Sequence, residues 1–160
     1  MERRYIILLF LVAIIPTFSA AGSTNVASSE PRMLDLHDCS IMKIFAHTWK
    51  YTPLVQEERA VWLVHSNGKY IGINWLRSPQ NRITVWSAPI PENIVAQAHT
   101  HGDHLDPKPS DADIGVARKL NIWVYTLTRK GIWRVSPDGT ITQEETRGWY
   151  DQTVGKCGKD

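Results

Sequence analysis

Hydrophobic residues recur at close to helical spacing between residues 33 and 49. Such spacing is typical of a helix that packs one face on a core. We therefore expect an N-terminal helix over residues 33–49. Its apolar positions are Leu36, Ile41, Met42, Ile44, Phe45 and Trp49.

The segment that follows changes to a strand pattern. Branched and aromatic residues fill residues 60–65 and alternate with polar residues over 70–76, and Asn67-Gly68 lies between the two runs. An Asn-Gly pair in that position is the strongest short-range signal for a β-hairpin. We expect a hairpin here and a third strand over residues 83–86.

Another helix and further strands are predicted from residue 94 onward. The short apolar run 94–98 indicates a buried strand, so His99 lies at a strand end. Residues 111–120 have helical spacing, and branched residues fill 122–128 and 132–135. This succession predicts an α/β (α+β) domain with one mixed sheet, an N-terminal helix and a helix after the strand that ends at His99.

The first 21 residues have the pattern of a secretory signal peptide. Two arginines precede an apolar run from Ile6 to Ile15, and the small residues Ser19 and Ala21 follow it. Ten apolar residues are about half of what a membrane-spanning helix needs. We therefore expect cleavage of residues 1–21, no stable membrane insertion afterwards, and a periplasmic or secreted protein of a bacterial envelope.

The remaining chain has the size of one small globular domain. Removal of 21 residues from 160 leaves 139, which is enough to bury a core. Residues 22–32 are small and polar and are expected to form a flexible leader, followed by one domain over 33–160. The formal net charge falls from +2 to +1, because the signal peptide carries two arginines and one glutamate. Charge therefore gives no reason to expect nucleic acid as a partner.

Cys39 and Cys157 are the two cysteines of the chain. They lie near opposite ends of the mature domain, and an exported protein folds in an oxidising compartment. We expect a disulfide between them. A zinc site built from thiolates is not expected, so any metal must bind to histidines and carboxylates.

The residues most informative about chemistry are AHTHGDHLDPKPSDAD, residues 98–113. His99 and His101 are two positions apart, so a continuing strand would direct both imidazoles to one side. Asp113 lies in the first turn of the predicted helix, from which its carboxylate could reach the same point. Three such ligands with a fourth position open are typical of a catalytic zinc site.

The spacing of these residues resembles the JAB/MPN (JAMM) metalloprotease superfamily. His99-Thr100-His101, eight intervening residues and Ser110-Asp111-Ala112-Asp113 follow its HxH and SxxD pattern, and residues 109–139 are similar to the helix and strand pair of the bacterial secreted and toxin-associated branch. The resemblance implies one Zn²⁺ per chain, held by His99, His101 and Asp113. It also implies hydrolysis of a peptide or isopeptide bond, with a substrate that remains open.

The same resemblance implies a glutamate that acts as general acid and base. Glu58 matches best, at the start of the run GluGluArgAlaValTrpLeuVal, and Glu57 is the alternative. Only one of the two can face the metal, because side chains alternate along a strand. Ser110 would hydrogen-bond the reacting water or the developing oxyanion. Val61 occupies a position where the family commonly has glycine.

Other interpretations of this segment remain open. HTHGDH also fits the HxHxDH pattern of the metallo-β-lactamase superfamily, with Asp103 and His104 as ligands, but no histidine follows His104. Ser110 and Asp113 alone could be a helix cap and a first-turn acid. A protein of this fold could also be a secreted, non-catalytic binding module with a structural zinc. An open coordination position would favour the enzyme, and a fourth protein ligand would favour the structural site.

Overall fold

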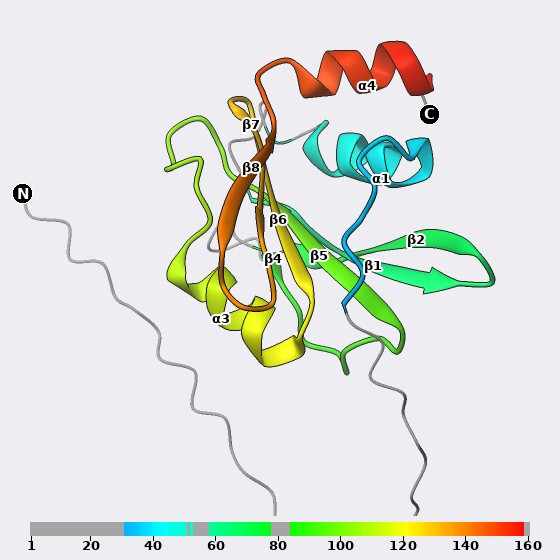
Figure 1. Cartoon of the computed structure of the whole chain (residues 1–160), viewed down its shortest axis with the longest axis vertical. Coiled ribbons are helices and arrows are strands. Elements are labelled where there is room, and N and C mark those ends of the chain that lie inside the picture. The colour runs from blue at the N-terminus through cyan, green and yellow to red at the C-terminus, as the bar shows by residue number, and fades with distance from the viewer. Residues whose placement is uncertain (1–30, 51, 53–57, 78–83, 159–160) are drawn as a thin grey trace, which may run out of the picture.

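The computed structural model describes residues 31–50, 52, 58–77 and 84–158, and Figure 1 shows their arrangement. The protein is a mixed α+β domain, as the sequence predicts. Residues 1–30, which include the predicted signal peptide and most of the leader, lie outside the described residues, as does Glu57. No helix in the described part of the chain is long and apolar enough to cross a membrane.

A six-stranded mixed sheet forms the centre of the domain, with strand order β2-β1-β5-β6-β7-β8. The central neighbours β5 and β6 run parallel, and every other neighbouring pair in this sheet is antiparallel. Two short strands, β3 and β4, form a separate sheet. The strands are β1 (Ala60–Ser66), β2 (Lys69–Asn74), β3 (Leu76–Arg77), β4 (Thr84–Val85), β5 (Ile94–Thr100), β6 (Trp123–Thr128), β7 (Gly131–Val135) and β8 (Ile141–Glu145).

Helices cover both faces of the large sheet. The helices α1 (Cys39–Trp49) and α4 (Trp149–Cys157) lie beside each other on one side, and α3 (Asp111–Leu120) lies on the other (Figure 1). Because α3 connects β5 to β6, it supplies the crossover that two parallel neighbouring strands require. The end of β5 and the beginning of α3 are therefore brought to the same edge of the sheet.

Alternating strand residues divide the core into two clusters. The larger cluster joins α1 and Trp149 of α4 to side chains such as Leu63, Ala98 and Tyr125. The smaller cluster joins Ala117 of α3 to Val124 and Val135. His99 follows Ala98 in β5, so its side chain points to the α3 face.

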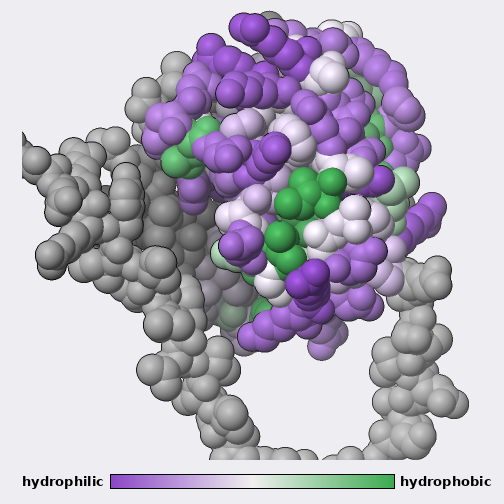
Figure 2. Space-filling model, turned by 60° about the vertical axis from the view of Figure 1, so that its left-hand side comes forward, coloured by the Kyte–Doolittle hydropathy of each residue, from purple (hydrophilic) through white to green (hydrophobic). Residues whose placement is uncertain are grey.

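One face of the domain is mainly polar (Figure 2). Figure 2 shows a largely hydrophilic face on which hydrophobic residues form only small patches. The large hydrophobic side chains that are exposed in the described chain come from separate segments, which is normal for a folded domain. They are Met33, Ile71, Leu76, Ile90, Leu105 and Ile141.

The N-terminal helix is shorter than predicted. It begins at Cys39 and not at Met33, because the Asp38 side chain accepts a hydrogen bond from the Ser40 amide and caps the helix there. The preceding residues are held against the sheet in a non-helical conformation. The Leu34 amide donates to the Tyr125 hydroxyl at 3.2 Å, and Trp123 Nε1 donates to the Pro31 carbonyl at 3.0 Å.

The hairpin prediction is confirmed. β1 and β2 pair in register around Asn67 and Gly68, whose φ angles are 50° and 73°. Positive φ at both central residues is the requirement of a type I′ turn, which Asn-Gly satisfies at little cost. The helix over 111–120 also has the predicted bounds.

Strand β8 and helix α4 are absent from the predictions. Four of the five β8 residues are exposed, so the strand has no apolar alternation to reveal it. Only Trp149 and Thr153 of α4 are buried, and two buried positions are too few to give a helical period.

The predicted disulfide between Cys39 and Cys157 is confirmed. It joins the first residue of α1 to the last residue of α4, across a separation of 118 residues, with a Cα–Cα distance of 5.4 Å. Trp49 and Trp149 pack between the same two helices, with ring centroids 6.3 Å apart. Covalent and apolar contacts therefore hold α1 and α4 together on the face opposite α3.

Candidate metal centre

The candidate ligands meet where β5 ends and α3 begins. Within the sheet, His99 pairs with Ala60 of β1 and with Thr126 of β6, and only 8% of its surface is exposed. The His101 amide donates to the Leu127 carbonyl at 3.0 Å, which continues the β5–β6 pairing past the strand end. Both histidines are thus fixed by the backbone of the sheet.

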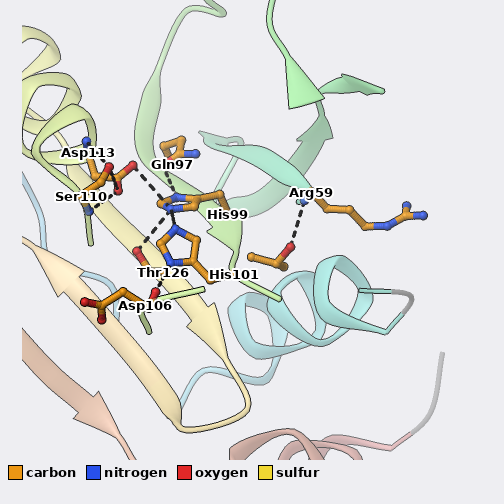
Figure 3. Close-up of polar contacts among 9 residues, drawn as sticks. Arg59, Gln97, His99, His101, Asp106, Ser110, Asp113 and Thr126 are labelled. Atoms are coloured by element: carbon orange, nitrogen blue, oxygen red, sulfur yellow. Dashed lines mark hydrogen bonds and ion pairs between the residues drawn. The ribbon is translucent and has the colours of Figure 1, made fainter. Parts of the chain in front are cut away.

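His99, His101 and Asp113 form a group that could hold a metal ion. One donor atom from each residue lies within 4.8 Å of the other two. The Nε2 atoms of the two histidines are 3.1 Å apart, and Asp113 Oδ1 is 3.5 Å from His99 Nε2 (Figure 3). Ligands at the bond lengths of tetrahedral zinc are separated by about 3.3 Å. These two separations therefore fit a common metal ion.

Contacts on the far side of each imidazole orient it toward that common point. His101 Nδ1 lies 2.6 Å from the Asp106 carbonyl oxygen, and His99 Nδ1 lies 3.3 Å from Gln97 Oε1 (Figure 3). Because both oxygens can only accept, this network assigns the proton of each ring to Nδ1. Both Nε2 lone pairs are then available to a metal, and that of His99 faces Asp113. Such outer hydrogen bonds are typical of metal-binding histidines.

Asp113 is held by its own helix. Its Oδ2 accepts hydrogen bonds from the Ser110 amide and the Ser110 hydroxyl, each at 2.7 Å, and this capping box leaves Oδ1 directed at His99. The capping interpretation of Ser110 is therefore correct. Capping does not compete with metal binding, because the two oxygens of Asp113 have separate partners.

The surroundings of His99 favour its neutral form. Burial and, to a smaller extent, the nearby His101 lower the pKa of His99 to about 4, although the Asp113 carboxylate opposes the shift. A neutral imidazole is the form that binds a metal. Thr126 Oγ1, 3.4 Å from His99 Nε2, is the additional polar neighbour of this atom.

Glu58 lies two residues before β1, close to the candidate ligands. The Arg59 amide donates to Thr100 Oγ1 and the Thr100 amide donates to the Arg59 carbonyl, so the same register brings Glu58 next to His101. Burial raises the pKa of the half-buried Glu58 carboxyl, while His101 and His104 lower it and Asp113 raises it. Glu58 is thus within electrostatic reach of the group.

The other polar residues of the connecting loop do not join the group in the described structure. Asp103 pairs with Arg129, with Oδ2 3.0 Å from Nη2. His104 is exposed, and the Asp106 carboxylate accepts from the Lys108 amide. The metallo-β-lactamase pattern, which requires Asp103 and His104 as ligands, therefore gains no support from their positions.

Sequence reasoning missed the residues that support the ligands. Gln97 could have been found, because it is a polar residue in an apolar strand and lies two positions before His99. Thr126 and the Asp106 carbonyl could not, because their approach depends on the pairing with β6 and on the path of the loop.

Three atoms with available lone pairs converge at this site, and a divalent cation fits such a set of two imidazoles and one carboxylate. Neither a model of a known protein family nor a curated protein matches the chain.

Proposed function

We propose that the protein is an exported, zinc-dependent peptidase or isopeptidase of the JAB/MPN (JAMM) type. The observation that carries the proposal is the convergence of His99, His101 and Asp113 at the junction of β5 and α3. Their order and spacing in the sequence, together with the mixed α+β fold, agree with the HxH and SxxD pattern on which the resemblance rests.

The donor set supports zinc and an open coordination position. Nitrogen and oxygen donors suit zinc, and among the described residues the group contains no fourth protein ligand. When bound, zinc would lower the pKa of water toward about 7 and polarise the carbonyl of an amide. The protein supplies the rest, namely the orientation of the ligands and a nearby proton acceptor.

Glu58 is the proposed general acid and base. Burial raises the pKa of Glu58 toward neutral pH. A carboxyl group with such a pKa can both accept a proton and return it during the reaction. In the proposed reaction it takes a proton from the attacking water and passes it to the leaving amine. Ser110 would orient Asp113 by donating its hydroxyl proton to Oδ2, and the same hydroxyl oxygen would accept a hydrogen bond from the reacting water.

Export is proposed from the N-terminal segment and the disulfide. Two arginines followed by ten apolar residues are typical of a signal peptide, and disulfides persist in oxidising compartments. The proposed location is the periplasm or the exterior of the cell. Substrates would be peptides or isopeptide-linked molecules found there.

Zinc content per chain is the first test of the proposal. We expect one zinc after dialysis, a strong loss in Asp113→Ala, and retention in Asp103→Ala. Dependence on Asp103 in place of Asp113 would favour the metallo-β-lactamase pattern. Absence of zinc from the intact protein would contradict the proposed metal centre.

Hydrolysis by the Glu58→Gln variant tests the catalytic role. Loss of a general acid and base lowers kcat by about 10²- to 10⁴-fold, while bound zinc should persist because Glu58 is not a proposed ligand. Glu92→Gln, in the loop before β5, is the matched control. Zinc binding without turnover of any peptide or isopeptide would identify the non-catalytic binding module instead.

A further inference from the structure

A cavity of about 230 Å³ lies directly beside the candidate ligands. His101 forms one wall, and the loop that follows it forms a second. The end of β6 with its turn into β7, and the connection from β8 to α4, line the rest of this open cavity. A molecule in this cavity would therefore touch one of the proposed metal ligands.

Positive charge exceeds negative charge around the cavity. Three cationic side chains line it, Arg129, Lys130 and Arg147, against the single carboxylate of Asp103. The Asp103–Arg129 pair is about half exposed, so it contributes little stability and can open readily. In the described part of the chain, no carboxylate forms an ion pair with Lys130 or Arg147.

A second cavity adjoins the first on the side where its arginines lie. It measures about 340 Å³, shares Arg129 and Arg147, and reaches the beginning of α4. Gly148 caps that helix without a side-chain hydrogen bond, so the partial positive charge of the helix end is offset only in part, by the acid of the first turn. Asp151, in the first turn, is the acidic residue on this side.

We propose that the cavity beside His101 binds a carboxylate of the substrate, close to the bond that is cleaved. Arginine and lysine form their strongest hydrogen bonds with such anions. Leu105 and Pro107 add apolar walls for the aliphatic part of the same residue. The carboxylate is either the C-terminus of a peptide or an acidic side chain. The statement that this carboxylate belongs to a substrate rests on the proposed peptidase function. The statement that the cavity binds a carboxylate does not.

Three small probes separate the two sources of the carboxylate. They are acetyl-alanyl-alanine with a free C-terminus, its C-terminal amide, and acetyl-glutamyl-alanine amide. Binding is measured by calorimetry on the protein as purified and after removal of metal by a chelator, so that a carboxylate held by a metal is recognised. At least one acidic probe should bind in both states, and the neutral amide should not. The acidic probe that binds more tightly identifies the source.

Charge-neutral variants locate the binding. Loss of a charge-assisted hydrogen bond should weaken binding of the acidic probe about tenfold in Lys130→Gln and in Arg147→Gln. Both side chains are exposed, so the fold should be unaffected. Lys119→Gln, an exposed position on α3 outside both cavities, is the matched control and should bind normally.

The outcomes distinguish this proposal from the proposed function. Equal binding of acidic and neutral probes, binding that requires the metal, or equal losses in the control would overturn the carboxylate site. Normal probe binding with no hydrolysis of any peptide would refute the peptidase function and leave the carboxylate site standing. If both proposals hold, Arg147→Gln raises KM for the acidic substrate and leaves its kcat and zinc content unchanged.

Discussion

His99 is the residue on which the site depends most. It is buried, its Nδ1 contacts Gln97 Oε1, and its Nε2 faces His101 and Asp113. A residue in this position must be neutral, correctly rotated and close to two other donors at once. The sheet fixes the position of His99, burial keeps its imidazole neutral, and the contact with Gln97 fixes the orientation of the ring.

Replacement of Gln97 should therefore affect metal binding more than folding. In Gln97→Leu the Nδ1 proton of His99 loses its acceptor while the volume of the side chain is largely kept. Loss of such an outer contact weakens metal affinity by about 10- to 100-fold. Competition with a chromogenic chelator measures the zinc affinity, and Gln152→Leu on α4 is the control. Unchanged affinity would mean that Gln97 does not orient His99.

Acid should destabilise the metal-free protein through His99. Its pKa is 6.5 in the unfolded chain and about 4 in the folded protein, so the unfolded state binds more protons between these values. The free energy of unfolding is therefore highest above pH 6.5 and falls on the order of 3 kcal/mol as the pH decreases toward 4. Urea unfolding at pH 7 and pH 5 measures the difference. In His99→Gln the free energy of unfolding should depend less on pH. If its pH dependence is identical to that of the unchanged protein, groups other than His99 cause the effect.

At the scale of elements, the first turn of α3 both caps the helix and orients a candidate metal ligand. The first turn of α3 is closed by the Ser110–Asp113 capping box, and the same turn aims Asp113 Oδ1 at His99. A flexible loop could bring the carboxylate to the same place, but it would lose entropy each time a ligand bound. The cap therefore prepares the site in advance.

Substitution of Ser110 tests this coupling. Ser110→Ala removes the hydroxyl that caps α3 and holds Asp113 Oδ2, so we expect a loss of about 1 kcal/mol in the free energy of unfolding and weaker zinc binding. Ser110→Thr keeps the hydroxyl and should restore both. Chemical denaturation and chelator competition give the two values. Weakened zinc binding without destabilisation would contradict a role for the cap.

The sequence predicted the elements whose signal is local. The Asn67-Gly68 turn and the Ser110 cap each depend on a few adjacent residues, and the hairpin and α3 were predicted with good bounds. The start of α1 was wrong, since apolar spacing before Cys39 serves contacts with the sheet and not a helix. Strand β8 has a largely exposed surface and pairs only with β7, so its position depends on tertiary contacts that no local pattern records.

Part of the candidate site is likewise predictable from local sequence, and part depends on tertiary contacts. The meeting of His99, His101 and Asp113 is predictable, because a strand end, the residue that follows it and the start of a helix fix their directions. The cationic cavity could not be predicted, since Arg129 and Lys130 lie in the β6–β7 turn whereas Arg147 lies in the distant β8–α4 connection. Only the assembled sheet brings the β6–β7 turn beside the loop after His101.

At the scale of the whole molecule, the two faces of the sheet have different tasks. The α3 face carries the candidate metal centre, and the opposite face carries the larger core, the α1–α4 contact and the disulfide. The larger core and the proposed chemistry are thereby located in different layers. Changes in one layer should leave the other largely intact.

Loss of the disulfide tests this separation. The double substitution Cys39→Ser and Cys157→Ser should lower the free energy of unfolding by about 2–4 kcal/mol, because the unfolded chain is no longer restrained. Zinc affinity should remain within about twofold under conditions where the variant is folded. Urea unfolding with and without reductant measures the first effect, and the variant itself should not respond to reductant. A large loss of zinc affinity would show that the two layers are coupled.

The bond between Cys39 and Cys157 also turns the domain into a closed loop of chain. A protease that cuts once within this loop, for example at the exposed turn after Ser66, would leave two pieces still tied to each other. Each piece keeps its partner at a high local concentration, so a nicked molecule can stay assembled. On a denaturing gel the cut would be invisible until a reducing agent is added.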